Sequence, residues 1–411
     1  MSVLEDKTIV VGVSGGIAAY KAAELVRQLV ARGAKVRVMM TRNAREFITP
    51  LTLQTLSAAP VATDTFSLTQ ESEIGHIRLA DSADAIVIAP ATANLIAKAA
   101  AGIADDIVTT VLLAARCPIA FAPAMNVHMY EHPTVGENLA RLKSRGATVI
   151  DPESGELACG YEGKGRLADP VAIAEEVERM LNAPHDLAAE RMLITAGPTQ
   201  EPIDPIRFVS NRSSGKMGFA IARAAWYRGA QVRLVAGPCV LATPHGVERI
   251  DASSAAEMLR ATARNFPWCS ALVMAAAVAD FRPAHPAAQK LKKDDRGLKL
   301  ELEPIADELP RLAARKGSRL MVGFAAETEA LESHARDKLK RKKLDLIVAN
   351  DVTQEGAGFG GDTNIVTIIG AGGRAESFPK LSKDEVAGLI LDRIVAIRTA
   401  KTASPSVRAA K

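Results

Sequence analysis

The chain has 411 residues, more than one compact core usually holds, so its length favours two domains. Hydrophobic residues make up 48% and charged residues 24%, as in ordinary globular enzymes. A net charge of +4 and 4% aromatic residues argue against a dedicated nucleic-acid binder. The four cysteines form no Cys-x-x-Cys pair, so neither a zinc site nor a disulfide framework is expected. The sequence has no apolar signal core or membrane-spanning run, and we expect a cytoplasmic protein.

The first half alternates short apolar runs with amphipathic stretches. Thr8–Val13 is typical of a strand buried on both faces, and a glycine turn then leads into a helix over residues 17–32. This alternation predicts a parallel, doubly wound sheet. Further strands are expected at 36–40, 85–89, 119–122 and 147–150, and further helices at 94–101 and 171–181.

The same pattern restarts after Pro184, which interrupts any continuing helix. We therefore expect an α/β protein of two tandem Rossmann-like domains with mostly parallel sheets. The domains are predicted at 1–182 and 191–398, with a linker at 183–190 and a disordered tail at 399–411. In the second half we expect a helix at 218–228 and strands at 192–195, 231–235, 271–275, 320–324, 346–349 and 364–369.

Glycines and small polar residues follow three of the expected strands. Gly15 and Gly16 form a turn that lets the backbone approach a phosphate, with a helix N-terminus behind it. The turn lacks the dinucleotide pattern and could equally be a tight strand–helix connection. Thr92 and Asn94 follow another strand at the same carboxyl edge, although Thr92 could act only as an N-cap. Thr41 ends the second strand similarly, so all five residues are candidates for cofactor binding.

Three residues of the first half are candidates for chemistry. A lone histidine such as His76 is more often structural than catalytic. The neutral side chain of Asn126 follows a strand and could bind a carboxylate or hold a turn. Cys159 lies in a glycine-rich stretch, which gives it the exposure that a proton donor or reactive thiol needs.

The second half carries a glycine-rich segment and clustered lysines. Residues 213–217 lack the upstream glycine of a P-loop, but a glycine-rich helix start can hold phosphate or carboxylate. The alanine run before Asp280 leaves room for a base or sugar, or else serves only tight packing. Lys290 stands in a basic turn of a kind that is usually solvated. Lys338 and Lys342 share a helix face, which favours an anion between them.

Residues 15–21, 89–94, 123–126 and the stretch around Cys159 occur together in this order. The combination resembles the flavin-containing cysteine decarboxylases. The domain order resembles the bifunctional phosphopantothenoylcysteine decarboxylase/phosphopantothenate–cysteine ligases of coenzyme A biosynthesis, over about residues 5 to 395. The resemblance implies that FMN oxidises the substrate thiol to a thioaldehyde, so that carbon dioxide leaves and 4′-phosphopantetheine forms. It also implies that His76 is the base, that Asn126 binds the substrate carboxylate and that Cys159 donates a proton.

The second half resembles the ligase domain of the same family. There CTP, assisted by Mg2+, activates the carboxylate of 4′-phosphopantothenate as an acyl-cytidylate, and cysteine then displaces CMP. The resemblance implies that Asn211 stabilises the acyl-cytidylate, that Lys290 stabilises the phosphate transition state and that Arg207 contacts substrate across a dimer interface. The implied substrate and CTP site further includes Ala275, Ala276, Asp280, Asp307, Phe324, Lys338 and Lys342. The sequence does not name the metal ligands.

The sequence departs from the family pattern in two places. Tyr130 stands where tryptophan commonly ends the Pro-x-Met-Asn motif, which affects wall packing. Residues 303–307 replace a common Lys-x-Pro-Asp-Ile, so the contacts of Asp307 stay open. The resemblance also implies homo-oligomers, with trimers assembling into dodecamers through the first domain and dimers forming through the second. No nucleic-acid or membrane partner is expected.

Two other functions remain open at this point. The chain could be a flavin electron carrier or reductase fused to an unrelated Rossmann module, or a regulatory subunit that keeps the flavin fold without activity. An electron carrier or reductase would not need His76, Asn126 and Cys159 together, nor the lysine cluster, and intact His76 and Cys159 argue against a regulatory subunit.

Overall fold

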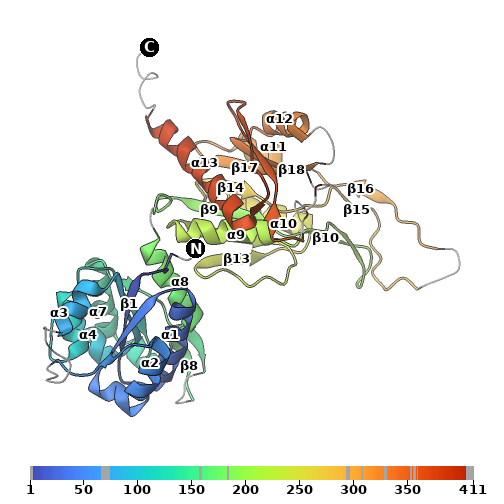
Figure 1. The fold of residues 1–411 in the computed structure, drawn as a ribbon. Helices are drawn as coiled ribbons and strands as arrows, with labels where there is room; N and C mark the ends of the chain where they lie inside the picture. The colour runs from blue at the N-terminus through green and yellow to red at the C-terminus, as the bar shows by residue number, and fades with distance from the viewer. Residues whose placement is uncertain are drawn as a thin grey trace. The chain divides into compact units, whose positions relative to one another are not determined.

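The computed structural model describes residues 3–65, 75–156, 160–182, 185–292, 297–306, 309–327, 331–351, 354, 358 and 360–403. The chain divides into two units, Met1–Ala183 and Pro184–Lys411. Each unit has a largely parallel sheet with helices on both faces, which confirms the predicted fold class (Figure 1). Within the described ranges, no helix combines the length and the apolar character needed to cross a membrane.

The first unit is built on a six-stranded, entirely parallel sheet. Its order is that of a Rossmann sheet, and the winding reverses between β1 and β4. The central β1 is buried on both faces because its residues are almost all apolar. From edge to edge the strands are β3 (Val61–Ala62), β2 (Lys35–Met40), β1 (Thr8–Val13), β4 (Ala85–Ala91), β5 (Ile119–Pro123) and β6 (Thr148–Val149).

Two groups of helices cover the two faces of this sheet (Figure 1). Leu25 of α1 and Ile173 of α8 pack on one face, and Leu95 of α4 and Val111 of α5 pack on the other. A hairpin of β7 (Glu153–Glu156) and β8 (Glu162–Arg166) precedes α8. The helices are η1 (Ile17–Tyr20), α1 (Lys21–Ala31), η2 (Arg42–Glu46), α2 (Pro50–Ser57), α3 (Gly75–Ser82), α4 (Ala93–Ala101), α5 (Ile107–Ala114), α6 (Val127–Tyr130), α7 (Pro133–Ser144) and α8 (Pro170–Leu181).

The second unit repeats this order in an eight-stranded sheet, and its winding reverses between β9 and β14. The pairs β18–β20 and β20–β21 are antiparallel, whereas the other pairs are parallel. The strands are β13 (Val247–Asp251), β12 (Gln231–Ala236), β9 (Arg191–Ala196), β14 (Ala271–Met274), β17 (Leu320–Glu327), β18 (Leu346–Asp351), β20 (Val366–Gly370) and β21 (Ala375–Ser377).

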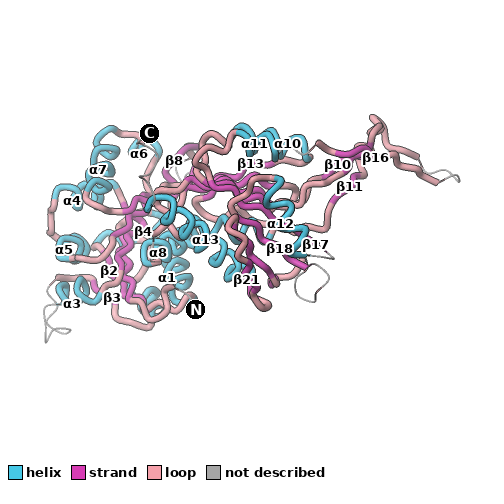
Figure 2. The backbone as a smooth tube through the Cα atoms, turned by 90° about the horizontal axis from the view of Figure 1, so that it is seen from above, coloured by secondary structure: helices cyan, strands magenta, loops and turns pink. Residues whose placement is uncertain are grey.

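Helices α9 (Lys216–Tyr227) and α13 (Lys383–Ala403) cover one face of this sheet. Helices α10 (Ala255–Asn265), α11 (Leu309–Ala314) and α12 (Leu331–Arg341) cover the other. A short pair of β19 (Thr363–Asn364) and β22 (Leu381–Ser382) precedes α13. Two hairpins project from the sheet and together form what we call the arm (Figures 1 and 2). They join β10 (Gln200–Pro202) to β11 (Phe208–Ser210) and β15 (Phe281–Pro283) to β16 (Leu302–Pro304).

Three expected elements differ in detail. The helix expected over 17–32 begins as the 3-10 turn η1 and becomes α-helical only at Lys21. The strand expected over 364–369 is interrupted at Ile365, which separates β19 from β20. In the expected linker, residues 185–190 belong to the second unit, because Leu187 is buried in its core and Asp186 pairs with Arg228. Residues 183 and 184 lie outside the described residues.

The expected disorder from residue 399 is wrong for residues 399–403, which continue α13. Arg398 pairs with Glu190, and Lys401 pairs with Asp345. These contacts attach the end of the helix to the sheet, and they are long-range contacts that local composition does not reveal. Residues 404–411 lie outside the described residues.

Candidate functional site

The first unit has a cavity of approximately 970 Å³ at the carboxyl ends of β1, β4 and β5. This is the point where the winding of the sheet reverses, and open parallel sheets bind ligands there. The expected cofactor residues Gly15, Gly16, Thr41, Thr92 and Asn94 all line it.

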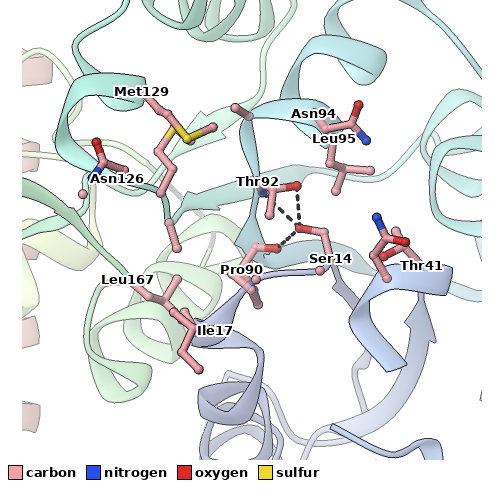
Figure 3. A pocket seen from close by; sticks show the side chains of 18 of the residues that line it. Ser14, Ile17, Thr41, Pro90, Thr92, Asn94, Leu95, Asn126, Met129 and Leu167 are labelled. Carbon is pink, nitrogen blue, oxygen red and sulfur yellow. Dashed lines mark hydrogen bonds between the residues drawn. The ribbon is translucent and has the colours of Figure 1, made fainter. Parts of the chain in front are cut away.

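A buried serine, Ser14, ties the two central strands together beneath this cavity (Figure 3). Its Oγ donates to the Pro90 carbonyl oxygen at 2.7 Å and accepts from the Thr92 backbone N–H at 3.0 Å. Thr92 occupies the N-cap position of α4, but its side chain makes no capping hydrogen bond. Its hydroxyl instead lies 3.1 Å from Ser14 Oγ, so Thr92 is more than an N-cap. Sequence reasoning missed Ser14, although it lies within the expected glycine turn.

Gly15 is required by a close approach of two loops. A Cβ at Gly15 would lie 2.4 Å from Asn43 Cβ and 2.7 Å from the Asn43 carbonyl carbon. Because the carbonyl carbon belongs to the backbone, it cannot move aside to relieve this overlap, so only glycine fits here. The Thr41 hydroxyl accepts from the Ala44 backbone N–H at 3.3 Å and caps η2. The glycine turn and the end of β2 therefore form one wall of the cavity.

Asn126 holds a turn, which is one of the two roles that its sequence left open. Its Oδ1 accepts from the His128 backbone N–H at 2.9 Å, so the side chain holds the turn that starts α6. The residue also lines the cavity, near Met129 (Figure 3). Tyr130 packs against the unit's core, with Lys164 Nζ 5.6 Å from its ring centre, and burial raises its pKa.

The other two chemical candidates lie away from this cavity or outside the described residues. His76 is half-buried in α3 and is not among the residues that line the cavity. Its Nδ1 is buried and has no hydrogen-bond partner within the described part of the chain. Cys159 falls outside the described residues.

Sequence reasoning assigned no role to two cations on the cavity wall, Lys21 and Arg166. Lys21 Nζ donates to the Leu167 carbonyl oxygen at 3.3 Å. Burial, and secondly the charge of Arg166, lower the pKa of Lys21. Arg166 comes from the β7–β8 hairpin, which no motif marked as part of the site.

The second unit has a cavity of approximately 1310 Å³ at the carboxyl ends of β9, β14 and β17. Seven of the expected residues line it: Asn211, Ala275, Ala276, Asp280, Phe324, Lys338 and Lys342. Asp307 lies outside the described residues, and Arg207 and Lys290 stand in the arm and are not among the lining residues. The structure therefore brings most, but not all, of the expected ligase site together.

One wall of the second cavity is the segment that follows β14. Asn211 Nδ2 donates to the carbonyl oxygens of Ala277 at 3.1 Å and Val278 at 3.3 Å. The buried hydroxyl of Thr199 accepts from the Ala279 backbone N–H at 3.0 Å. Ala275 and Ala276 remain partly exposed toward the cavity, so the alanine run leaves room for a ligand and does not serve packing alone. Close helix packing occurs at Gly218, where a Cβ would lie 2.4 Å from Ala196 Cβ.

Cations also line this cavity. Lys338 Nζ donates to the Phe324 carbonyl oxygen at 2.8 Å, and Lys342 is largely buried. Partly buried ammonium groups are screened less by water, so they favour the binding of a polyphosphate. Within the described residues, no group of three or more His, Cys, Asp or Glu side chains is arranged to hold a metal.

Sequence reasoning assigned no role to Lys383, nor to Lys216, which lies in the glycine-rich segment of residues 213–217. Both line the second cavity. Lys216 Nζ pairs with Asp362 at 2.7 Å, and Lys383 Nζ donates to the Gly361 carbonyl oxygen at 2.5 Å. Burial, and secondly repulsion from Lys216, lower the pKa of Lys383. The fold joins the two lysines from positions far apart in sequence, which explains why no local pattern revealed the pair.

Two Rossmann-like units, each with a ligand cavity where its winding reverses, define a two-domain enzyme with one nucleotide-type site in each domain. The family model "Flavoprotein" matches residues 2–182, and "DNA/pantothenate metabolism flavoprotein C-terminal domain" matches residues 187–397. The chain belongs to the family of bifunctional phosphopantothenoylcysteine decarboxylase/phosphopantothenate–cysteine ligases of coenzyme A biosynthesis.

Three relatives illustrate the similarity, each a coenzyme A biosynthesis bifunctional protein CoaBC. That of Bacillus subtilis (strain 168) is 49% identical, over 96% of this chain and 98% of that protein. That of Vibrio cholerae serotype O1 (strain ATCC 39315 / El Tor Inaba N16961) is 47% identical, over 96% and 99%. That of Escherichia coli (strain K12) is 47% identical, over 95% and 97%. The chain accordingly carries a decarboxylase and a ligase of one pathway.

Proposed function

We propose that residues 1–182 form an FMN-dependent phosphopantothenoylcysteine decarboxylase and that the ligase of the second unit uses CTP. The observation that carries the first assignment is the gathering of Gly15, Gly16, Thr41, Thr92 and Asn94 around one cavity. The cationic cavity of the second unit supports the other assignment. In this scheme the second unit makes the cysteine adduct that the first unit consumes.

The first cavity suits FMN in size and in chemistry. Its volume lies within the range of about 300–1,000 Å³ found for small-molecule sites. The hydroxyls of Thr41 and Thr92 and the amide of Asn94 can hydrogen-bond a phosphate and the ribityl chain. When bound, FMN supplies reversible oxidation of the substrate thiol, which makes loss of carbon dioxide possible.

The chain's own side chains orient the substrate and move its protons. We assign Asn126, on the cavity wall, to the substrate carboxylate, His76 to the base and Cys159 to the proton donor. Because His76 is not on the wall of this cavity, we propose that it serves the site of another copy of the chain. An orienting partner for its buried Nδ1 would then come from that neighbouring copy.

In the ligase, Asn211 stabilises the acyl-cytidylate, and Lys338 and Lys342 neutralise the phosphates of CTP. Lys290 stabilises the transition state of nucleotidyl transfer, and Arg207 contacts substrate from the arm of a partner in a dimer. The base and sugar of CTP lie along Ala275, Ala276, Asp280 and Phe324, with Asp307 as a further contact.

Mg2+ accompanies the triphosphate and needs no dedicated cage of side chains. Magnesium commonly binds one or two carboxylates together with substrate phosphates. Asp280 and Asp337 are carboxylates on the wall of the second cavity and are the candidates for such contacts.

We further propose a cytoplasmic homo-oligomer, built from trimers that form dodecamers through the first unit and from dimers through the second. Ile17 and Tyr20, at the rim of the first cavity, are 62% and 60% exposed. Exposed apolar side chains beside a site are typical of a surface that another subunit covers. CTP, 4′-phosphopantothenate and cysteine are the small-molecule partners, and no nucleic acid or membrane takes part.

One assay tests the whole scheme. The purified chain, incubated with 4′-phosphopantothenate, cysteine and CTP, should release CMP, carbon dioxide and 4′-phosphopantetheine. Absence of both CMP and carbon dioxide would refute the proposal. A yellow protein that releases neither would point instead to a flavin carrier or reductase.

A further inference from the structure

Asp204, in the turn between β10 and β11, is a charged side chain that the scheme above does not use. Its side chain is fully buried. Its Oδ1 accepts from the backbone N–H groups of Ile206 and Arg207, both at 2.8 Å, and its Oδ2 accepts from Arg207 Nε at 2.9 Å. The hydrogen bonds from the Arg207 side chain hold the pKa of this carboxyl well below its usual range. Asp204 is therefore an ionised anchor inside the arm.

The same anchor reaches the other hairpin of the arm. The Leu291 backbone N–H donates to Asp204 Oδ2 at 3.2 Å, and Arg207 Nη2 donates to the Leu291 carbonyl oxygen at 2.6 Å. At the other end of this segment, the Ala287 backbone N–H donates to the Ile203 carbonyl oxygen at 2.8 Å. Residues 287–291 are thus fixed at both ends, and Lys290 lies between the two attachments.

Lys290 depends on this tether for its position. The side chain is exposed, and among the described residues it has no polar partner that could fix it. A lysine carries a flexible four-carbon stem, so an unfixed backbone would spread its ammonium group over a wide volume. Arg207 can hold Asp204 and Leu291 and also contact substrate. Its Nη1 has no partner within the described ranges and can face a substrate phosphate.

We infer that Asp204 is a positioning residue of the ligase, which acts through Arg207 and Leu291 to place Lys290 at the nucleotidyl-transfer site. The inference rests on the proposed role of Lys290. It adds that the two hairpins of the arm work as one unit held by a single buried carboxylate. Misplacement of a catalytic group by about 1 Å can cost about 100-fold in rate, so such a tether matters for catalysis.

A double-mutant cycle on the full-length enzyme tests this inference. The variants are Asp204→Asn, Lys290→Ala and their combination, and the measurement is steady-state pyrophosphate release from CTP in the presence of 4′-phosphopantothenate and cysteine. Loss of a charge-stabilising group should lower kcat by about 100-fold in Lys290→Ala. Asp204→Asn should lower kcat by about 10-fold with a smaller change in KM, because the charge that binds Arg207 is lost. The double variant should lie within about two-fold of Lys290→Ala, since Asp204 acts through Lys290.

Three results would overturn the inference. Losses that multiply in the double variant would mean that Asp204 acts independently of Lys290. An unchanged rate in Lys290→Ala would overturn the proposed role of Lys290, and the inference with it. Equal rate losses in Asp204→Asn and in a matched stability control would reduce Asp204 to a structural residue.

Asp345→Asn is the matched control. Asp345 is also largely buried, accepts from the Met321 backbone N–H at 2.8 Å and pairs with Lys316 at 2.6 Å. It lies at the amino end of β18, at the sheet edge opposite the cavity. The control should lower the Tm of the second unit as Asp204→Asn does, but leave kcat within about two-fold. If Asp204→Asn does not fold, Asp204→Glu keeps the charge, displaces it by one methylene, and enters the same cycle.

Discussion

The two cavities occupy equivalent places in two sheets of the same strand order, yet their walls differ in charge. In the first, cations are accompanied by acids, as in the 2.7 Å pair of Lys98 with Asp105. In the second, lysines and arginines far outnumber the acids, Asp280 and Asp337, among the described residues of the wall. The negative charge of one flavin phosphate needs few cationic side chains to balance it, whereas the charge of a triphosphate and of its transition state needs many more. The shared topology sets where a ligand binds, and the loop side chains set which ligand it is.

The walls also differ in how they are held. The first cavity is held by close backbone packing at Gly15 and by the neutral hydroxyl of Ser14, besides one ammonium group, that of Lys21, which donates to a backbone carbonyl oxygen. In the second, side-chain amides and ammonium groups bond to backbone carbonyl oxygens, as at Asn211 and Lys338. Substitutions that change shape should therefore damage the first site, and substitutions that change charge should damage the second.

The largest effect should come from Cys159→Ser in the first half. If Cys159 is the proton donor, the variant should still bind FMN and release carbon dioxide but stop before the final protonation. Mass spectrometry should then detect an oxidised product in place of 4′-phosphopantetheine, while CMP release stays normal. Full turnover by the variant would refute the proton-donor role.

Asn211→Asp should have the next largest effect, confined to the second site. The variant loses the N–H groups that donate to the carbonyl oxygens of Ala277 and Val278 and that we propose to stabilise the acyl-cytidylate. Removing one such donor costs about 100- to 1,000-fold. Cysteine transfer should fall more than cytidylate formation when pyrophosphate and CMP release are measured separately. Asn265→Asp, which changes an amide bonded to Ala261 within α10, is the matched control, and equal loss of both steps would contradict the assignment.

Gly15→Ala should weaken the first site through shape alone. The added Cβ overlaps Asn43, and overpacking of this kind costs about 1–3 kcal/mol. FMN binding, followed by flavin absorbance during dialysis, should weaken by about 10- to 100-fold, because each 1.4 kcal/mol corresponds to a factor of ten. Gly136→Ala adds a Cβ that meets nothing within 4 Å and should leave FMN binding unchanged. Tight FMN binding by Gly15→Ala would mean that the loop at Asn43 moves freely.

This contrast also explains what the sequence could predict. Buried strands and glycine turns are local patterns, so the fold class and residues such as Gly15 and Thr92 are predictable from them, whereas Asn211 is predicted only by the family resemblance. Lys383 was not predicted, because only the folded chain brings it to the same cavity as Lys216, from a position more than a hundred residues away. The missed helix at 399–403 has the same cause, because distant ion pairs hold it. Arg207 and Lys290 lie in the arm, and a single chain does not place them on the wall of the cavity.

Lys342→Ala should weaken the second site through charge. Removal of an ammonium group near a phosphate at a partly buried surface costs about 1–2 kcal/mol, so KM for CTP should rise by about 10-fold. The rise should grow smaller at high ionic strength, where charges are screened. The exposed Lys380→Ala is the control for net charge and should leave KM unchanged. FMN affinity should not change in either variant, and a parallel loss would contradict the division between the two sites.

The smallest effect should be a pH dependence of the second site. Because burial and Lys216 lower the pKa of Lys383, its ammonium group loses its proton at a lower pH than an ordinary lysine does. The charge of Asp362 raises the pKa of Lys383, but this effect is smaller than those of burial and of Lys216. As pH rises through the lowered pKa, affinity for the anionic substrates should fall, by about five-fold if one charge contributes about 1 kcal/mol.

Folding stability should respond in the opposite direction. The charged form of Lys383 is disfavoured in the folded state, so its penalty is present at lower pH and fades as pH rises between the lowered pKa and that of the unfolded chain. KM for CTP and the Tm of the second unit should be measured from pH 7.5 to 10.5. Deprotonation of Lys383 should raise both quantities as pH increases. The arginine of Lys383→Arg stays charged over this pH range, so the variant should lose the part of each rise that comes from Lys383. A KM profile that Lys383→Arg leaves unchanged would assign the loss of binding to another lysine on that wall, and would leave Lys383 as a structural contact to Gly361.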